Sequence, residues 1–130
     1  QASPRTPQTP SKSIDSESFK SRFIINTAKG SYFLEINNIS YFNAQEGVVK
    51  AIDLQGKSHL MSVSTLKEIE ESVDPSKFFR INRAELVHQV AIERMERYGK
   101  NSLAIQVVGS DKKLVTSQST TAAFREWVEQ

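Results

Sequence analysis

The sequence predicts one small domain that is mostly β, built from antiparallel hairpins and two short helices. After residue 21, most of the chain consists of short runs rich in β-branched and aromatic residues, separated by glycine-containing or polar turn segments. Only two stretches repeat their apolar residues at helical spacing. The 130 residues and the 38% hydrophobic content are ordinary for a single soluble globular domain.

The first 20 residues differ from the rest in composition. They hold three of the four prolines, many Ser, Thr and Gln residues and few apolar ones. This composition is typical of a solvated tether. We therefore expect a flexible linker at 1–20 and a folded domain at 21–130. Because the chain begins with Gln rather than Met, we also expect that it comes from a longer protein with another domain upstream.

The first half of the domain is predicted to be a series of antiparallel strands. Gly30, Gly47 and Gly56 stand in the turns between runs, where glycine adopts a positive φ at no steric cost. The expected strands are 22–27, 31–35, 39–44, 48–54 and 57–62.

A short acidic helix is expected next. Ser64 or Thr65 can cap it, and the apolar residues that follow repeat at helical spacing until Pro75 ends it. Its outward face carries Glu68, Glu70, Glu71 and Asp74. A phosphate backbone would be repelled by such a face, so we expect it to meet water or a protein partner.

The second half is predicted to contain further strands and a final helix. The strands are expected at 78–81, 92–98, 102–108 and 113–117, and the helix at 120–129. Phe124, Trp127 and Val128 stand at i, i+3 and i+4 in that helix, so they form one apolar stripe that a sheet can bury.

The composition argues against several classes of function. The chain has no cysteine, which excludes disulfides, thiolate zinc sites and cysteine nucleophiles. His59, expected on a strand surface, and His88, expected at the edge of the core, lack a metal-ligand partner three or four residues later. No nucleophile elbow or phosphate-binding glycine loop occurs. We predict a protein without catalysis, metal or cofactor.

No apolar run is long enough to span a bilayer, and the N-terminal segment lacks the apolar centre of a signal peptide. We therefore expect a cytoplasmic protein without a membrane partner. The formal charge of +2 is too small to argue for nucleic acid, so the position of individual basic residues has to decide.

The run from 78 to 87 is the most informative segment for function. It sets Arg80, Asn82 and Arg83 among apolar residues that can anchor them. Arg and Asn side chains can read base edges through two hydrogen bonds, and Arg can also grip a phosphate. The alternative for Arg83 is a surface ion pair with Glu85. Nucleic acid is the leading partner that this run predicts.

Planar or cationic donors of the same kind stand in other loops and at strand ends, where base-edge and phosphate contacts need them. The candidates are Gln45, Lys50, Arg80, Asn82, Arg83, Lys112, Lys113 and Gln118. The polar run 116–121 before the last helix can cap that helix, and its hydroxyls, Ser117 included, also suit a phosphate oxygen.

Several landmarks occur in a fixed order along the chain. They are ISYFNA at 39–44, LKEIE at 66–70, FFRINRAELV at 78–87, IERM at 92–95, and LVTS at 114–117 before a final helix with Phe124. In order and spacing, the chain from about Phe23 to Val128 resembles the LytTR family of DNA-binding domains.

The resemblance implies an elongated β fold of several small antiparallel sheets with two short helices, whose loops enter successive major grooves and bend the duplex. Family members are usually C-terminal effector domains of response regulators in two-component systems, which fits a tether and an upstream receiver domain. By resemblance, Arg83 takes a base-contacting position and Gln118 a position that is often basic. The loop from Gln45 to Lys50 corresponds to the first groove-entering loop.

The chain departs from the family pattern beside these positions. Asn82 and Ala84 replace the more usual His and Ser, Gln118 replaces a cation, and Val48 replaces an aromatic residue. These departures leave the base preference open.

We predict a transcriptional regulator domain that binds double-stranded DNA sequence-specifically, with a homodimer on DNA as one arrangement that would strengthen binding. The predicted contacts are Gln45, Lys50, Arg80, Asn82, Arg83, Lys113, Ser117 and Gln118. The alternative is a β-rich interaction module that recruits a protein through its acidic helix or an open strand edge.

Overall fold

The computed structural model describes residues 19–129, so nearly all of the predicted linker at 1–20 lies outside the described residues. The strands are β1 (Arg22–Thr27), β2 (Gly30–Glu35), β3 (Ile39–Gln45), β4 (Val48–Asp53), β5 (Ser58–Leu60), β6 (Phe78–Arg80), β7 (Glu85–His88), β8 (Ile92–Tyr98), β9 (Ser102–Val107) and β10 (Leu114–Val115). The helices are α1 (Leu66–Glu70), α2 (Thr121–Val128) and two single 3-10 turns, η3 (Ile36–Asn38) and η4 (Gln89–Ala91). The predicted class, mostly β with two short helices, is confirmed.

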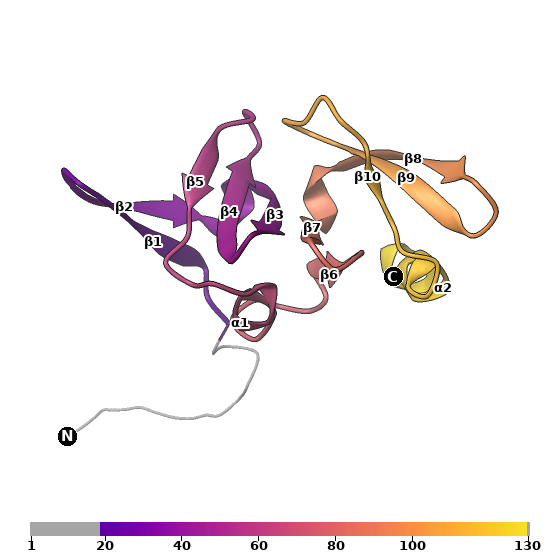
Figure 1. Ribbon diagram of the computed structural model, residues 1–130, viewed down its shortest axis with the longest axis horizontal. Coiled ribbons are helices and arrows are strands. Elements are labelled where there is room, and N and C mark those ends of the chain that lie inside the picture. Colours follow the sequence, from indigo (N-terminus) through magenta and orange to yellow (C-terminus); the bar gives the residue numbers. More distant parts are fainter. Residues whose placement is uncertain (1–18, 130) are drawn as a thin grey trace, which may run out of the picture.

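Three small antiparallel sheets follow one another along the long axis of the molecule (Figure 1). β1 and β2 form a hairpin at one end, the central sheet has the order β5-β4-β3-β7-β6, and the last sheet has the order β10-β9-β8. The elongated arrangement that the family resemblance implied is therefore present. Neither α-helix of the described part is long and apolar enough to cross a bilayer.

The central sheet separates two hydrophobic cores, because neighbouring residues of a strand point to opposite faces. Phe42 and Leu86 face one core, which also contains apolar residues of the β1–β2 hairpin and of α1. Tyr41 and Val87 face the other core, which they share with β9, β10 and α2. Both ends of the molecule are thus packed against one sheet.

Strand β7 is absent from the sequence-based prediction, although it lies inside the central sheet between β3 and β6. All four of its residues are buried. A strand covered on both faces loses the apolar and polar alternation that identifies a half-exposed strand, and a run this short is ambiguous. Of the other predicted strands, 22–27 and 92–98 match β1 and β8 in both bounds, and the rest differ from the observed strands by one or two residues at their ends.

Both histidines are buried, which corrects the expected positions of these side chains. His59 is only 8% exposed; its Nδ1 lies 2.6 Å from the Tyr32 hydroxyl and its Nε2 lies 2.9 Å from Asp53 Oδ2. His88 is 1% exposed, and its Nδ1 donates to the Ile39 carbonyl oxygen at 2.8 Å. Sequence patterns missed this burial because it depends on tertiary contacts of β5 and β7.

The β9–β10 loop packs closely against the β4–β5 turn. Gly109 has a φ of +85°, and a Cβ placed there would lie 2.6 Å from the Asp53 carbonyl oxygen and 2.9 Å from the Gly56 nitrogen. The Ser40 hydroxyl also donates to the Val108 carbonyl oxygen at 2.6 Å. Glycine is required at position 109, and this contact fixes the last sheet against the central one.

Candidate nucleic-acid interface

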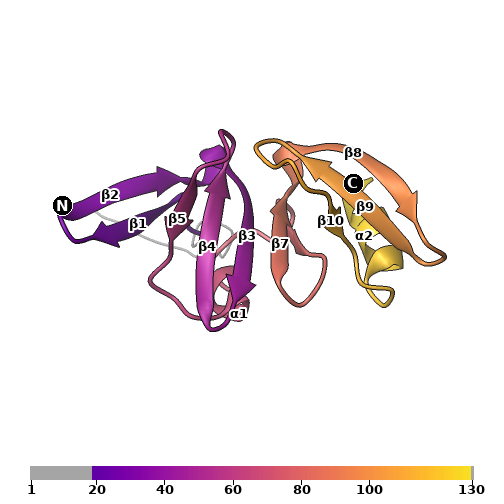
Figure 2. The same ribbon diagram turned by 45° about the horizontal axis from the view of Figure 1, so that its top comes forward.

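Three loops with predicted site residues lie along the same edge of the molecule (Figure 2). They are the β3–β4 turn, the β6–β7 loop and the segment that leads from β10 into α2. The β6–β7 loop is the middle one of the three. Hydrogen bonds join it to both neighbours.

The β3–β4 turn is tied to the β6–β7 loop through the end of β3. The Ala44 amide donates to the Ala84 carbonyl oxygen at 2.8 Å. Asn43 Nδ2 donates to Glu85 Oε2 at 3.2 Å, and Asn43 stands opposite Lys50 in the β3–β4 ladder. The first loop is therefore held at a fixed distance from the middle one.

Asn82 joins the middle loop to the last strand. Its Nδ2 donates to the Val115 carbonyl oxygen at 2.7 Å and to Glu85 Oε1 at 2.9 Å, and its Oδ1 accepts from the Ala84 amide at 2.8 Å. Both Nδ2 hydrogens are used within the protein. Asn82 therefore positions the middle loop, and its base contact stays a prediction.

The segment before α2 is bonded to the same loop at Ile81. The Ser117 amide donates to the Ile81 carbonyl oxygen at 2.9 Å, and the Thr120 hydroxyl donates to that oxygen at 2.8 Å. Ser117 Oγ lies 2.8 Å from Thr120 Oγ1. Thr120, the N-cap residue, makes no side-chain capping bond, so these hydroxyls connect the segment to its neighbours instead of capping α2.

Arg80 supports the middle loop through hydrogen bonds to its backbone. Its guanidinium donates to the carbonyl oxygens of Asn82 at 3.3 Å and Arg83 at 3.0 Å, and to Glu70 Oε1 of α1 at 3.1 Å. The side chain is 36% exposed. With three acceptors engaged, this guanidinium supports the loop, and its contact with a phosphate stays a prediction.

Arg83 is exposed at the tip of the middle loop. Among the ion pairs of residues 19–129, none involves its guanidinium. Glu85, the alternative partner considered from the sequence, is buried and accepts from Asn43 and Asn82, with Lys112 Nζ 3.7 Å away. The guanidinium donors of Arg83 are thus available to a ligand.

The β3–β4 turn projects Gln45 and Lys50 into solvent. Gln45 pairs with Val48, which leaves Glu46 and Gly47 as a two-residue turn with φ values of +54° and +79°. Positive φ at both positions is the geometry of a type I′ turn, which matches the twist of the flanking strands. Gln45 and Lys50 are exposed and line a shallow hollow of about 170 Å³ beside the turn.

A family model for the LytTr DNA-binding domain matches residues 29–129. The chain belongs to the LytTR family. A solved structure similar to it is the LytTr DNA-binding domain of a Bacillus cereus protein described as a methyl-accepting/DNA response regulator. The two share 17% sequence identity with a TM-score of 0.75, over 85% of this chain and 99% of that chain, which is a likeness of fold. No curated protein gives a significant match to the sequence.

The LytTR family is a family of DNA-binding domains, not of catalysts.

In this LytTR domain, Gln118 is exposed at the end of the third loop. Lys113 is also exposed, but its Nζ is paired with Glu96 of β8, and that bond lowers the pKa of the Glu96 carboxyl. Lys113 is therefore paired with the last sheet, and its contact with DNA stays a prediction.

Sequence reasoning missed the linking role of three residues that hold this edge of the LytTR domain together. Asn43, Glu85 and Thr120 link loops that are far apart along the chain; the Asn43–Glu85 bond, for example, spans 42 positions. A carboxylate directly before a short apolar run is the one local signal that could have identified Glu85 as a structural acceptor, because such a position is covered if the run is a buried strand.

Proposed function

We propose that this LytTR domain binds double-stranded DNA sequence-specifically, with the three joined loops in the major groove. The main support is Arg83, which is exposed and has no carboxylate partner in residues 19–129. It lies on the middle one of the three loops, which hydrogen bonds join to one another. Its bidentate donors suit a guanine edge, which is worth about 1–3 kcal/mol of discrimination.

The other exposed donors flank Arg83. Gln45 and Gln118 carry amide groups suited to base edges, and Lys50 carries a charge suited to a phosphate. Arg80, Asn82 and Ser117 hold the loops in place from within. Because the loops are already ordered, binding costs less conformational entropy than it would for mobile segments.

We further propose that the domain acts as the effector of a transcriptional regulator with an upstream receiver domain. The support is the predicted linker at 1–20 and the description of the similar Bacillus cereus protein as a response regulator. Two domains about one helical turn apart on the duplex would double the contacts, and pairing of their chains would raise the affinity because the second binding event becomes intramolecular.

Selection of bound fragments from random duplex DNA tests the proposal, because it reports both binding and the preferred site. On that site, Arg83→Ala should weaken binding roughly five- to 150-fold and relax the preference at one base pair. The matched control is Lys57→Ala, an exposed cation in the β4–β5 turn at the far end of the central strands.

A selection that enriches no sequence would contradict specific DNA binding. It would favour the interaction module instead, and the apolar pair Ile24 and Phe33 would then be the first surface to examine. These two side chains face each other across the β1–β2 hairpin and are 53% and 54% exposed.

A further inference from the structure

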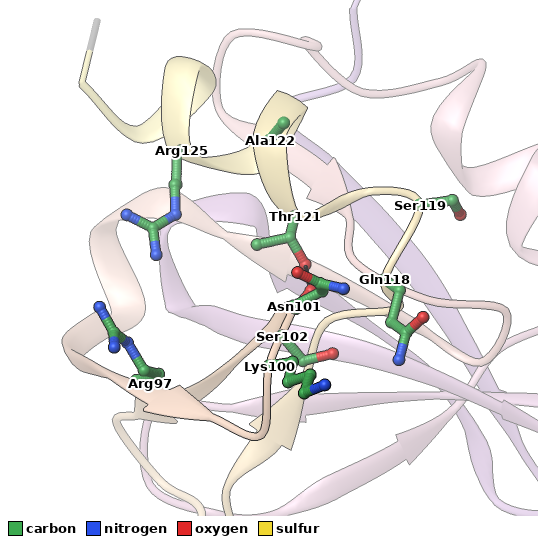
Figure 3. Close-up of a pocket in the computed structure, with 9 residues that line it drawn as sticks. All are labelled: Arg97, Lys100, Asn101, Ser102, Gln118, Ser119, Thr121, Ala122 and Arg125. Carbon is green, nitrogen blue, oxygen red and sulfur yellow. Dashed lines mark hydrogen bonds between the residues drawn. The ribbon is translucent and has the colours of Figure 1, made fainter.

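A positively charged hollow lies next to the third loop, between the β8–β9 turn and the start of α2 (Figure 3). Its volume is about 780 Å³. Three cationic side chains line it, namely Arg97, Lys100 and Arg125, together with the amide side chains of Asn101 and Gln118. Gln118 belongs both to this hollow and to the third loop of the interface.

The cations of the hollow are not neutralised by the protein. Among the ion pairs of the described residues, none involves Arg97, Lys100 or Arg125. The guanidinium groups of Arg97 and Arg125 point toward a common space (Figure 3). Glu129 lines an adjoining hollow with the same arginines but forms no ion pair with either within residues 19–129. Like charges placed together repel, and an anion between them would relieve that repulsion.

The walls of the hollow are fixed before any ligand arrives. The Thr121 hydroxyl donates to the Asn101 carbonyl oxygen at 2.7 Å, which joins the start of α2 to the β8–β9 turn. The Leu103 amide donates to Thr116 Oγ1 at 2.9 Å, which joins β9 to the third loop. Arg97 stands opposite Leu103 in the β8–β9 ladder. The hollow is therefore held in a fixed position relative to the third of the proposed DNA-binding loops.

We propose that this hollow holds two neighbouring backbone phosphates of the duplex that the three loops read, one between Arg97 and Arg125 and one at Lys100. The inference rests on the proposed function and extends it to the sugar-phosphate strand beside the third loop. Guanidinium groups match phosphate oxygens in geometry and charge, and such contacts fix the register of a protein on DNA without reading sequence.

The test is the salt dependence of binding by the full chain. For wild type and for the double variant Arg97→Gln/Arg125→Gln, the association constant is measured against salt concentration on the selected duplex and on a scrambled duplex. Each phosphate contact contributes a log–log slope of about −0.9. We expect the slope of the double variant to be shallower by about 0.9 on both duplexes, while its preference for the selected sequence stays unchanged.

The matched control is Lys29→Gln/Lys57→Gln, which removes the same charge from the β1–β2 and β4–β5 turns and should keep the wild-type slope. Thermal melting checks that each variant is folded. If the arginine variant is not folded, Lys100→Gln at the tip of the β8–β9 turn replaces it, with an expected slope change of about 0.9.

A wild-type slope for the arginine variant, or for Lys100→Gln in its place, would overturn the phosphate site. The proposed function would still stand if Arg83→Ala lost specificity in the same assay. If the wild-type chain bound no duplex, both proposals would fall. Amide NMR with inorganic phosphate is the second arm: shifts at residues 99–102 and 118–122 with phosphate but not with duplex would identify a free-anion site and overturn the DNA assignment.

Discussion

Replacing Asn82 with alanine should both destabilise the domain and weaken DNA binding. The substitution removes the bonds to Glu85, to the Val115 carbonyl and from the Ala84 amide. Two neutral bonds are worth about 0.5–1.5 kcal/mol each and one to a charged group about 1.5–3 kcal/mol. If all three contributed fully, the free energy of unfolding would fall by about 2.5–6 kcal/mol. Asn82 is only half-buried and Glu85 keeps its bond from Asn43, so we expect a loss of about 2–4 kcal/mol.

Urea denaturation measures this loss as a change in the free energy of unfolding. Asn37→Ala is the matched control, because Asn37 is exposed on η3 and should change stability by no more than about 0.5 kcal/mol. Affinity for the selected duplex, measured on the folded variant without urea, should fall about tenfold or more, because the loop that carries Arg83 loses its anchor. An Asn82→Ala protein as stable as the control would refute the role given to this network.

Two further predictions concern pH and salt. Burial lowers the pKa of His88, with a smaller opposing effect of its bond to the Ile39 carbonyl. The neutral ring thus contributes stability that is complete above the ordinary histidine pKa of about 6.5 and is lost as pH falls toward the lowered value. The urea midpoint should drop between pH 7 and pH 5, and His88→Asn should flatten that drop; an equal drop in both proteins would contradict the assignment. Gln118→Arg should steepen the log–log salt slope of DNA binding by about 0.9, and an unchanged slope would argue against a phosphate near position 118.

Local chemistry made most of the fold predictable. The strands expected at 22–27 and 92–98 match β1 and β8 in both bounds, because glycine-containing turns and alternating side chains mark hairpins directly. Strand β7 could not be found in this way. Its residues are buried by β3, β6 and both cores, and only the assembled sheet shows that environment.

In the candidate site, too, local features could be predicted from the sequence and long-range contacts could not. The exposure of Arg83 and Gln118 follows from their places in loops, which the sequence shows. The engagement of Asn82 does not, since its acceptor Val115 lies 33 positions away. Residues of one chemical type therefore have different roles here, and long-range hydrogen bonds decide which asparagine or arginine remains free for DNA.

The most direct test of the interface is an amide NMR titration of the isotope-labelled chain with the selected duplex. We predict that the largest shifts occur in the β3–β4 turn, the β6–β7 loop and the segment before α2, while the β1–β2 hairpin and the acidic face of α1 stay unchanged. Shifts confined to α1 or the hairpin, with the three loops unaffected, would contradict it.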